Sequence, residues 1–206
     1  MKNDYKIKKQ ERERIRDEQR KHSLRGKTIK SLLRFSIWTV VLVLIVYGGL
    51  LFMRSTAPQG EDFSTAYVPQ EAVHVTDGSS HPPYNSNPPS SGWHYAQPTN
   101  GGFYDESISD EAVIHNLEHG DIWIAYHPRI SDTSKSALKK FAGRYVVISP
   151  RSENEGDISL VAWGRVDTFN IENGVVDTER IKDFVRRYDN HGPERVRGVR
   201  TSPGGF

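Results

Sequence analysis

The chain has 206 residues and no cysteine, which excludes disulfides and thiolate metal ligands. Its total charge of +2 hides two parts of opposite sign. Residues 1–34 hold thirteen Lys and Arg against five Asp and Glu, a net charge of +8, whereas the chain from Ser55 onward carries −7. The basic part is almost free of aromatic residues, so we expect no nucleic-acid binding there.

An uncharged apolar run from Phe35 to Met53 separates the two parts. About 19 residues at ~1.5 Å each make a helix of roughly 28 Å, close to a hydrocarbon core of ~30 Å. A cleaved signal peptide would need a shorter basic region and a shorter apolar run. The pattern therefore predicts an uncleaved transmembrane helix over 34–54. By the positive-inside rule, residues 1–33 form a basic cytoplasmic tail, either solvated or in contact with anionic lipids.

The remainder is expected outside the cytoplasm of a single-pass cell-membrane protein. We predict a polar linker over 55–70, a compact domain over 71–195 and a flexible tail over 196–206. Residues 81–106 contain five prolines and show no hydrophobic periodicity. Their aromatic residues argue against disorder, so this stretch is predicted to be an ordered loop on the domain surface.

The second half of the domain shows regular patterns. Residues 121–127 alternate like a strand with one face toward the core, and amphipathic periodicity predicts helices over 134–142 and 177–188. Further strands are predicted over 144–149, 158–163 and 165–169. The expected fold class is α+β: one N-terminal transmembrane helix, then a compact domain with a mixed β-sheet packed by helices and a long ordered Pro/Gly-rich loop.

Six of the eight histidines fall between His74 and His127. His115 and His119 are four residues apart in a predicted helix, so they share one helix face with Glu111. Acidic residues in the first turn and Gly120 directly after His119 support this helix. Imidazole is the commonest protein ligand for zinc and copper, so the pair indicates a metal site.

Such a site needs further ligands. His94 is the best third candidate because it lies in a loop shaped by Pro and Gly, and His74 and His81 come next. Glu111 or Glu118 would complete the coordination shell. Nitrogen and oxygen donors without sulfur fit Cu(II) or Zn(II). Each histidine taken alone is also compatible with an ordinary hydrogen-bonded residue.

Several segments resemble the uncharacterised bacterial family filed as domain of unknown function 3105. The resemblance covers roughly residues 70–195 and implies a membrane-anchored exported domain with no established activity. It rests on His74-Val75, Tyr84-Asn-Ser-Asn-Pro-Pro-Ser-Ser-Gly-Trp-His94, Gly102-Phe-Tyr104, Glu111-Ala-Val-Ile-His-Asn-Leu-Glu-His-Gly120, Trp163-Gly164 and Gly192-Pro193-Glu194.

Three functions remain open from the sequence. The first is a metal-binding module. The second is a metal-dependent hydrolase, because the order H-x-x-E-H occurs in one class of zinc proteases; Glu118 would be its base and Glu179 or Glu194 its later ligand. The third is a non-catalytic module in which the histidines form a polar core and the aromatic loop binds a protein or cell-envelope partner. The sequence does not decide whether the protein is an enzyme.

Overall fold

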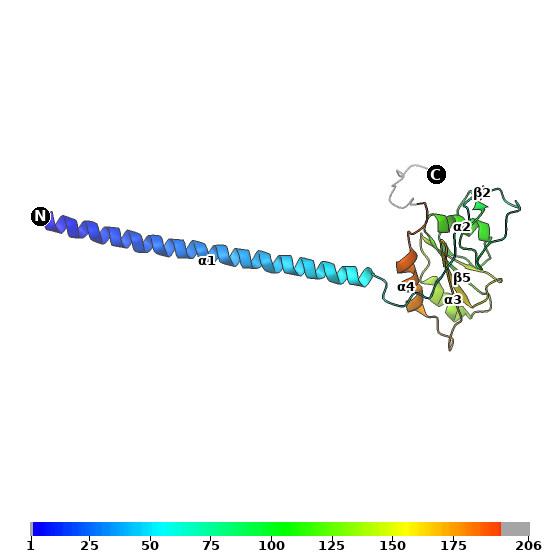
Figure 1. The fold of residues 1–206 in the computed structure, drawn as a ribbon. Helices are drawn as coiled ribbons and strands as arrows, with labels where there is room; N and C mark the ends of the chain where they lie inside the picture. The colour runs from blue at the N-terminus through cyan, green and yellow to red at the C-terminus, as the bar shows by residue number, and fades with distance from the viewer. Residues whose placement is uncertain (1, 195–206) are drawn as a thin grey trace. The chain divides into compact units, whose positions relative to one another are not determined.

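The computed structural model describes residues 2–194, so the predicted tail over 196–206 lies outside the described residues. The chain divides into two compact units, Met1–Thr56 and Ala57–Phe206. The first unit is the single helix α1, Lys2–Thr56 (Figure 1). Residues predicted as a tail are therefore helical too, and α1 ends just before Pro58, where a following proline disfavours helical geometry. Within α1, Leu32–Arg54 is long and apolar enough to cross a membrane.

The second unit contains a mixed six-stranded sheet in the order β1-β8-β7-β5-β6-β4. β5 is parallel to β6, and β4 is also parallel to β6, whereas the remaining neighbours are antiparallel. The strands are β1 (Thr65–Ala66), β4 (Gly102–Phe103), β5 (Ile122–Tyr126), β6 (Val146–Pro150), β7 (Ile158–Ala162) and β8 (Arg165–Phe169). The predicted α+β class and its mixed sheet are confirmed.

Helices cover both faces of this sheet. Helices α3 (Asp132–Lys139) and α4 (Thr178–Tyr188) pack on one face, against a cluster that includes Ile122 and Ile124. Helix α2 (Asp110–Glu118) packs on the other face, against Trp123. The expectation that only one face of residues 121–127 meets the core was wrong. All five residues of β5 are buried because the strand lies between two helical layers.

The loop over 81–106 is ordered but does not stay on the surface as predicted. Residues 88–92 are buried, and the loop contains β3 (His94–Tyr95) as well as β4. Ser90 and Ser91 have no exposed surface. Hydrogen bonds make this burial possible: the Ser91 hydroxyl accepts from the Gln70 amide, and the Ser90 carbonyl accepts from the Gly164 amide.

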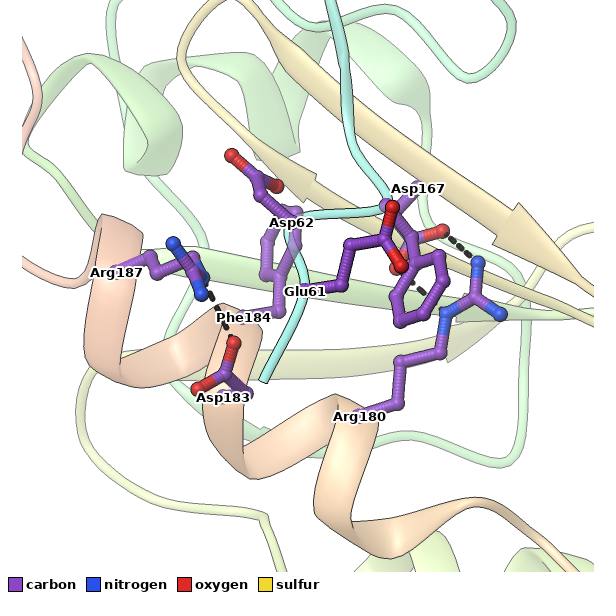
Figure 2. Close-up of a pocket in the computed structure, with 8 residues that line it drawn as sticks. Glu61, Asp62, Asp167, Arg180, Asp183, Phe184 and Arg187 are labelled. Atoms are coloured by element: carbon purple, nitrogen blue, oxygen red, sulfur yellow. Dashed lines mark hydrogen bonds and ion pairs between the residues drawn. The ribbon is translucent and has the colours of Figure 1, made fainter. Parts of the chain in front are cut away.

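Part of the predicted linker is bound to the domain. β1 pairs with β8, and the Asp183 carboxylate on α4 accepts hydrogen bonds from the backbone amides of Gln59 and Gly60, at 2.5 and 3.1 Å. Figure 2 shows Glu61 and Asp62 beside α4, where Arg187 pairs with Asp183 at 2.7 Å. Both ends of the segment 59–66 are therefore bound to the domain, because α4 supplies partners for the backbone of residues 59 and 60 and β8 pairs with residues 65 and 66.

Candidate metal centre

Helix α2 positions two histidines and a glutamate. It begins after Ser109, carries Asp110 and Glu111 in its first turn and has His119 as its C-cap. Gly120 follows with a φ of 84°, the left-handed conformation that favours glycine at this position. His115 and Glu118 are buried on this helix, so their polar atoms must find partners inside the domain.

A short parallel strand pair supplies two more histidines. β2 (His74–Val75) pairs with β3 so that His74 lies directly opposite His94. Residues opposite each other in a pair of strands project from the same face, which brings the two imidazoles side by side. The His94 side chain has no exposed surface, whereas that of His74 is 51% exposed.

His74, His94 and His115 converge; we call these three residues the inner triad. Their ring centroids form a nearly equilateral triangle, 5.0 Å for His74–His94, 4.9 Å for His74–His115 and 5.1 Å for His94–His115. One ligand atom from each residue lies within 4.8 Å of the other two. Two nitrogens on one tetrahedral zinc lie ~3.3 Å apart, given Zn–N bonds of ~2.0–2.1 Å. Shifts of about 1 Å would close the triad around an ion, so it is geometrically able to hold one.

The two buried histidines of the inner triad have defined tautomers. Nδ1 of His94 lies 2.7 Å from the Gly92 carbonyl oxygen, and Nδ1 of His115 lies 2.7 Å from the Tyr95 carbonyl oxygen. A carbonyl can only accept, so each Nδ1 carries the proton and donates it. In the neutral rings Nε2 then carries a lone pair, which on His115 faces Nε2 of His119 at 3.1 Å and on His94 faces Oε2 of Glu118 at 3.0 Å. Metal-binding histidines typically have this arrangement, with the other ring N–H given to a backbone carbonyl.

Gly92 is required for this geometry. Its φ of +119° is unfavourable for other residues, and a Cβ at this position would lie 3.0 Å from the Tyr84 ring. The Tyr84 hydroxyl in turn donates to the Trp93 carbonyl at 2.7 Å. The turn that presents the Gly92 carbonyl to His94 is thus held by close packing on its outer side.

Glu118 faces the inner triad. Its Oε2 lies 3.0 Å from Nε2 of His94 and 3.8 Å from Nε2 of His74, and its side chain is 8% exposed. An ionised carboxylate and an imidazole lone pair cannot bond to each other without a positive charge between them. A proton or a metal cation satisfies both groups, so the pair has the donor chemistry of a cation site.

Burial lowers the pKa of His115, and the neighbouring His119, His94 and His74 lower it further, while the hydrogen bond to the Tyr95 carbonyl opposes the shift. A lowered pKa keeps the ring neutral at pH 7. The neutral ring is the form that ligates metals, so the environment of His115 favours binding.

His119 and Glu194 lie next to the inner triad; we call these two residues the outer pair. Nε2 of His119 lies 3.1 Å from Nε2 of His115 and 3.3 Å from Oε2 of Glu194. Glu194 reaches this position because the segment after α4 packs on the end of α2. The amide of Glu194 donates to the Glu118 carbonyl, and a Cβ on Gly192 would lie 2.1 Å from that oxygen. Only glycine permits this close approach.

The other predicted candidates are not members of the inner triad. His81 and Glu111 bind each other, with Nε2 of His81 3.1 Å from Oε1 of Glu111. The hydrogen bond to the Pro82 carbonyl raises the pKa of His81, and Glu111 raises it further. Glu179, one possible late ligand of a hydrolase, pairs with Lys182 on the surface at 2.6 Å.

Compared with the sequence-based expectation, His74 takes the place of His119 in the tightest group. The three-histidine group predicted from the sequence was His94, His115 and His119, with His74 ranked lower. The backbone carbonyls of Gly92 and Tyr95 were missed, and no sequence signal identifies them. Glu194 was named only as a hydrolase ligand, and the structure brings it to His119.

Residues 58–200 match the family described as Protein of unknown function (DUF3105), and the chain belongs to that family. The resemblance inferred from the histidine-containing segments is therefore confirmed. No curated protein and no solved structure matches the chain.

Proposed function

We propose that the domain following α1 binds one divalent copper or zinc ion through the inner triad, His74, His94 and His115. Glu118 contributes the negative charge that a divalent cation favours in a buried site. The donor set contains nitrogen and oxygen and no sulfur, which fits Cu(II) and Zn(II). The observation that carries the proposal is the pair of donated Nδ1 protons on His94 and His115, because they leave two Nε2 lone pairs for one shared ion.

Metal analysis tests this proposal directly. The full-length, tag-free chain in detergent micelles is incubated with Cu²⁺ or Zn²⁺, passed through a desalting column and measured by elemental analysis. We expect about one ion per chain to remain bound, because one triad accepts one ion. Retention of no ion by the unmodified chain would show that the histidines form a hydrogen-bonded polar core instead.

A metal-dependent hydrolase is the second candidate, and one contact favours it. Glu194 lies 3.3 Å from His119, so one histidine of the H-x-x-E-H ligand pair meets a later glutamate, and the other histidine, His115, lies 3.1 Å from His119. The position of Glu118 argues against it. As the base it would have to face a metal-bound water near His119, yet its carboxylate lies 3.0 Å from His94. Metal binding by the inner triad is therefore the better supported function.

We also propose that Leu32–Arg54 anchors the chain in the membrane, with the N-terminus in the cytoplasm and the domain outside. The support is the charge of +8 over residues 1–34 directly before the span. Protease added to intact cells should digest the domain and spare an epitope placed at the N-terminus. Loss of the N-terminal epitope with survival of the domain would reverse the orientation, and release of the domain into the medium would indicate a cleaved signal sequence.

A further inference from the structure

The outer pair, His119 and Glu194, has no role in the proposed metal site. Its side chains are 23% and 51% exposed, whereas His94 has no exposed surface and His115 is 5% exposed. Donor atoms therefore run from solvent to the buried triad in the order Glu194, His119, His115. Oε2 of Glu194 lies 3.3 Å from Nε2 of His119, and Nε2 of His119 lies 3.1 Å from Nε2 of His115.

These separations are those of a hydrogen bond and an ion pair, and they are also close to the spacing of ligands on a single ion. Two nitrogens bound to one zinc at ~2.0–2.1 Å lie ~3.3 Å apart. His119 and His115 can therefore hold the same ion with little movement. An ion held on the single Nε2 lone pair of His115 would exchange His119 for His74 and His94 through shifts of these side chains, and it would stay bound to the protein throughout.

A polar hollow leads to His119. The hollow has a volume of about 530 Å³, and Asn116, Asp121 and Tyr145 also line it. About six first-shell waters at ~30 Å³ each occupy roughly 180 Å³, so a hydrated divalent ion fits. The lining also holds one acidic and one basic side chain, the buried Asp121 and Arg144, whose charges offset each other. The hollow therefore provides space for a hydrated ion next to His119 and no net electrostatic attraction.

We propose that His119 and Glu194 form an outer binding position through which the divalent ion is taken up and released, with His115 as the ligand shared between the outer pair and the inner triad. This rests on the proposed metal-binding function. With such an outer position, the ion enters and leaves the inner triad readily. A protein that passes metal to other molecules requires this property, whereas a structural site encloses its ion in a complete set of protein ligands.

An exchange ligand has a distinctive effect. It lowers the barrier between free and bound ion, so it accelerates uptake and release alike and leaves the equilibrium affinity almost unchanged. A permanent ligand instead changes the affinity, and a residue that is merely structural changes neither rate. Kinetics and affinity measured together therefore separate these three roles.

The experiment compares the unmodified full-length chain with His119→Gln, Glu194→Gln and the control His127→Gln, all in detergent micelles. Cu²⁺ uptake is followed by stopped-flow quenching of tryptophan fluorescence, which Trp93 beside His94 should report. EDTA then removes the ion, and Kd is obtained separately by competition with a chelator. We expect uptake and removal to slow by roughly tenfold in both outer-pair variants while Kd changes by less than about threefold. His127→Gln should match the unmodified chain.

Two results would overturn the exchange role alone. If uptake and removal keep their rates in His119→Gln and Glu194→Gln, the outer pair is not on the route of the ion. If His119→Gln raises Kd by more than about threefold, His119 is a permanent ligand. Failure of the unmodified chain to bind Cu²⁺ would instead reject the metal-binding function, and the exchange role with it.

Discussion

Saturating Cu²⁺ or Zn²⁺ should raise the melting temperature of the unmodified chain, and His94→Ala or His115→Ala should abolish that rise. An ion that binds only the native state at about 1,000 times its Kd adds ~4 kcal/mol to the free energy of unfolding. At ~2–4 °C per kcal/mol for a domain of this size, the melting temperature should rise by roughly 8–16 °C. Differential scanning calorimetry with and without metal measures the shift.

Each variant is compared with its own metal-free form, because replacing the fully buried His94 also lowers stability by itself. His74→Ala provides a third variant whose side chain is 51% exposed and therefore less important for packing. His127→Ala is the matched control, since its Nδ1 accepts a hydrogen bond from the Arg129 amide away from the triad. An undiminished metal-dependent shift in all three triad variants would place the ion elsewhere.

Arg180→Ala should destabilise the domain strongly. The Arg180 guanidinium makes two hydrogen bonds to the Asp167 carboxylate, at 2.9 and 2.5 Å (Figure 2), and lies 4.3 Å from the Phe63 ring centroid. The Asp167 side chain is only 3% exposed. Removing Arg180 leaves this buried carboxylate without its cation, which costs about 3–5 kcal/mol. Urea denaturation monitored by circular dichroism measures the loss.

A double variant separates charge from packing. Asp167→Leu combined with Arg180→Met removes both charges, so no uncompensated charge stays buried and most of the lost stability should return. Arg180 also packs against Phe63 from the segment before β1, so Arg180→Ala should expose residues 59–64 to protease. A cost below about 1 kcal/mol would mean that the pair behaves like a solvated surface ion pair.

The burial of residues 88–92 within the loop over 81–106 could not be predicted from the local sequence pattern. Composition correctly indicated an ordered segment, but burial of Ser90 and Ser91 depends on hydrogen bonds to Gln70 and Gly164, which come from other parts of the chain. The burial of β5 likewise could not be predicted from its own sequence. Its sequence alternates, yet both faces are buried because α2 packs on the side opposite α3 and α4.

The sequence alone was sufficient to predict the long apolar helix, the strands and helices of the second half, the end of α2 shortly before Gly120 and the family. Each depends on residues close together in the chain, where hydrophobic period and capping residues act directly. It also identified His94 and His115 as candidates. The tautomer of His94, however, depends on the Gly92 carbonyl, in a turn whose shape requires tertiary packing. The tautomer of His115 depends on the Tyr95 carbonyl, which β3 brings to α2.

Only the tertiary structure brought His74 into the centre and Glu194 to His119. The two-residue strands β2 and β3 are too short to show any periodicity, so their parallel register could not be predicted. Glu194 arrives through backbone contacts of the segment after α4 with the end of α2, which no side-chain pattern specifies. The local sequence therefore determined which residues can ligate a metal, and long-range packing decided which of them meet.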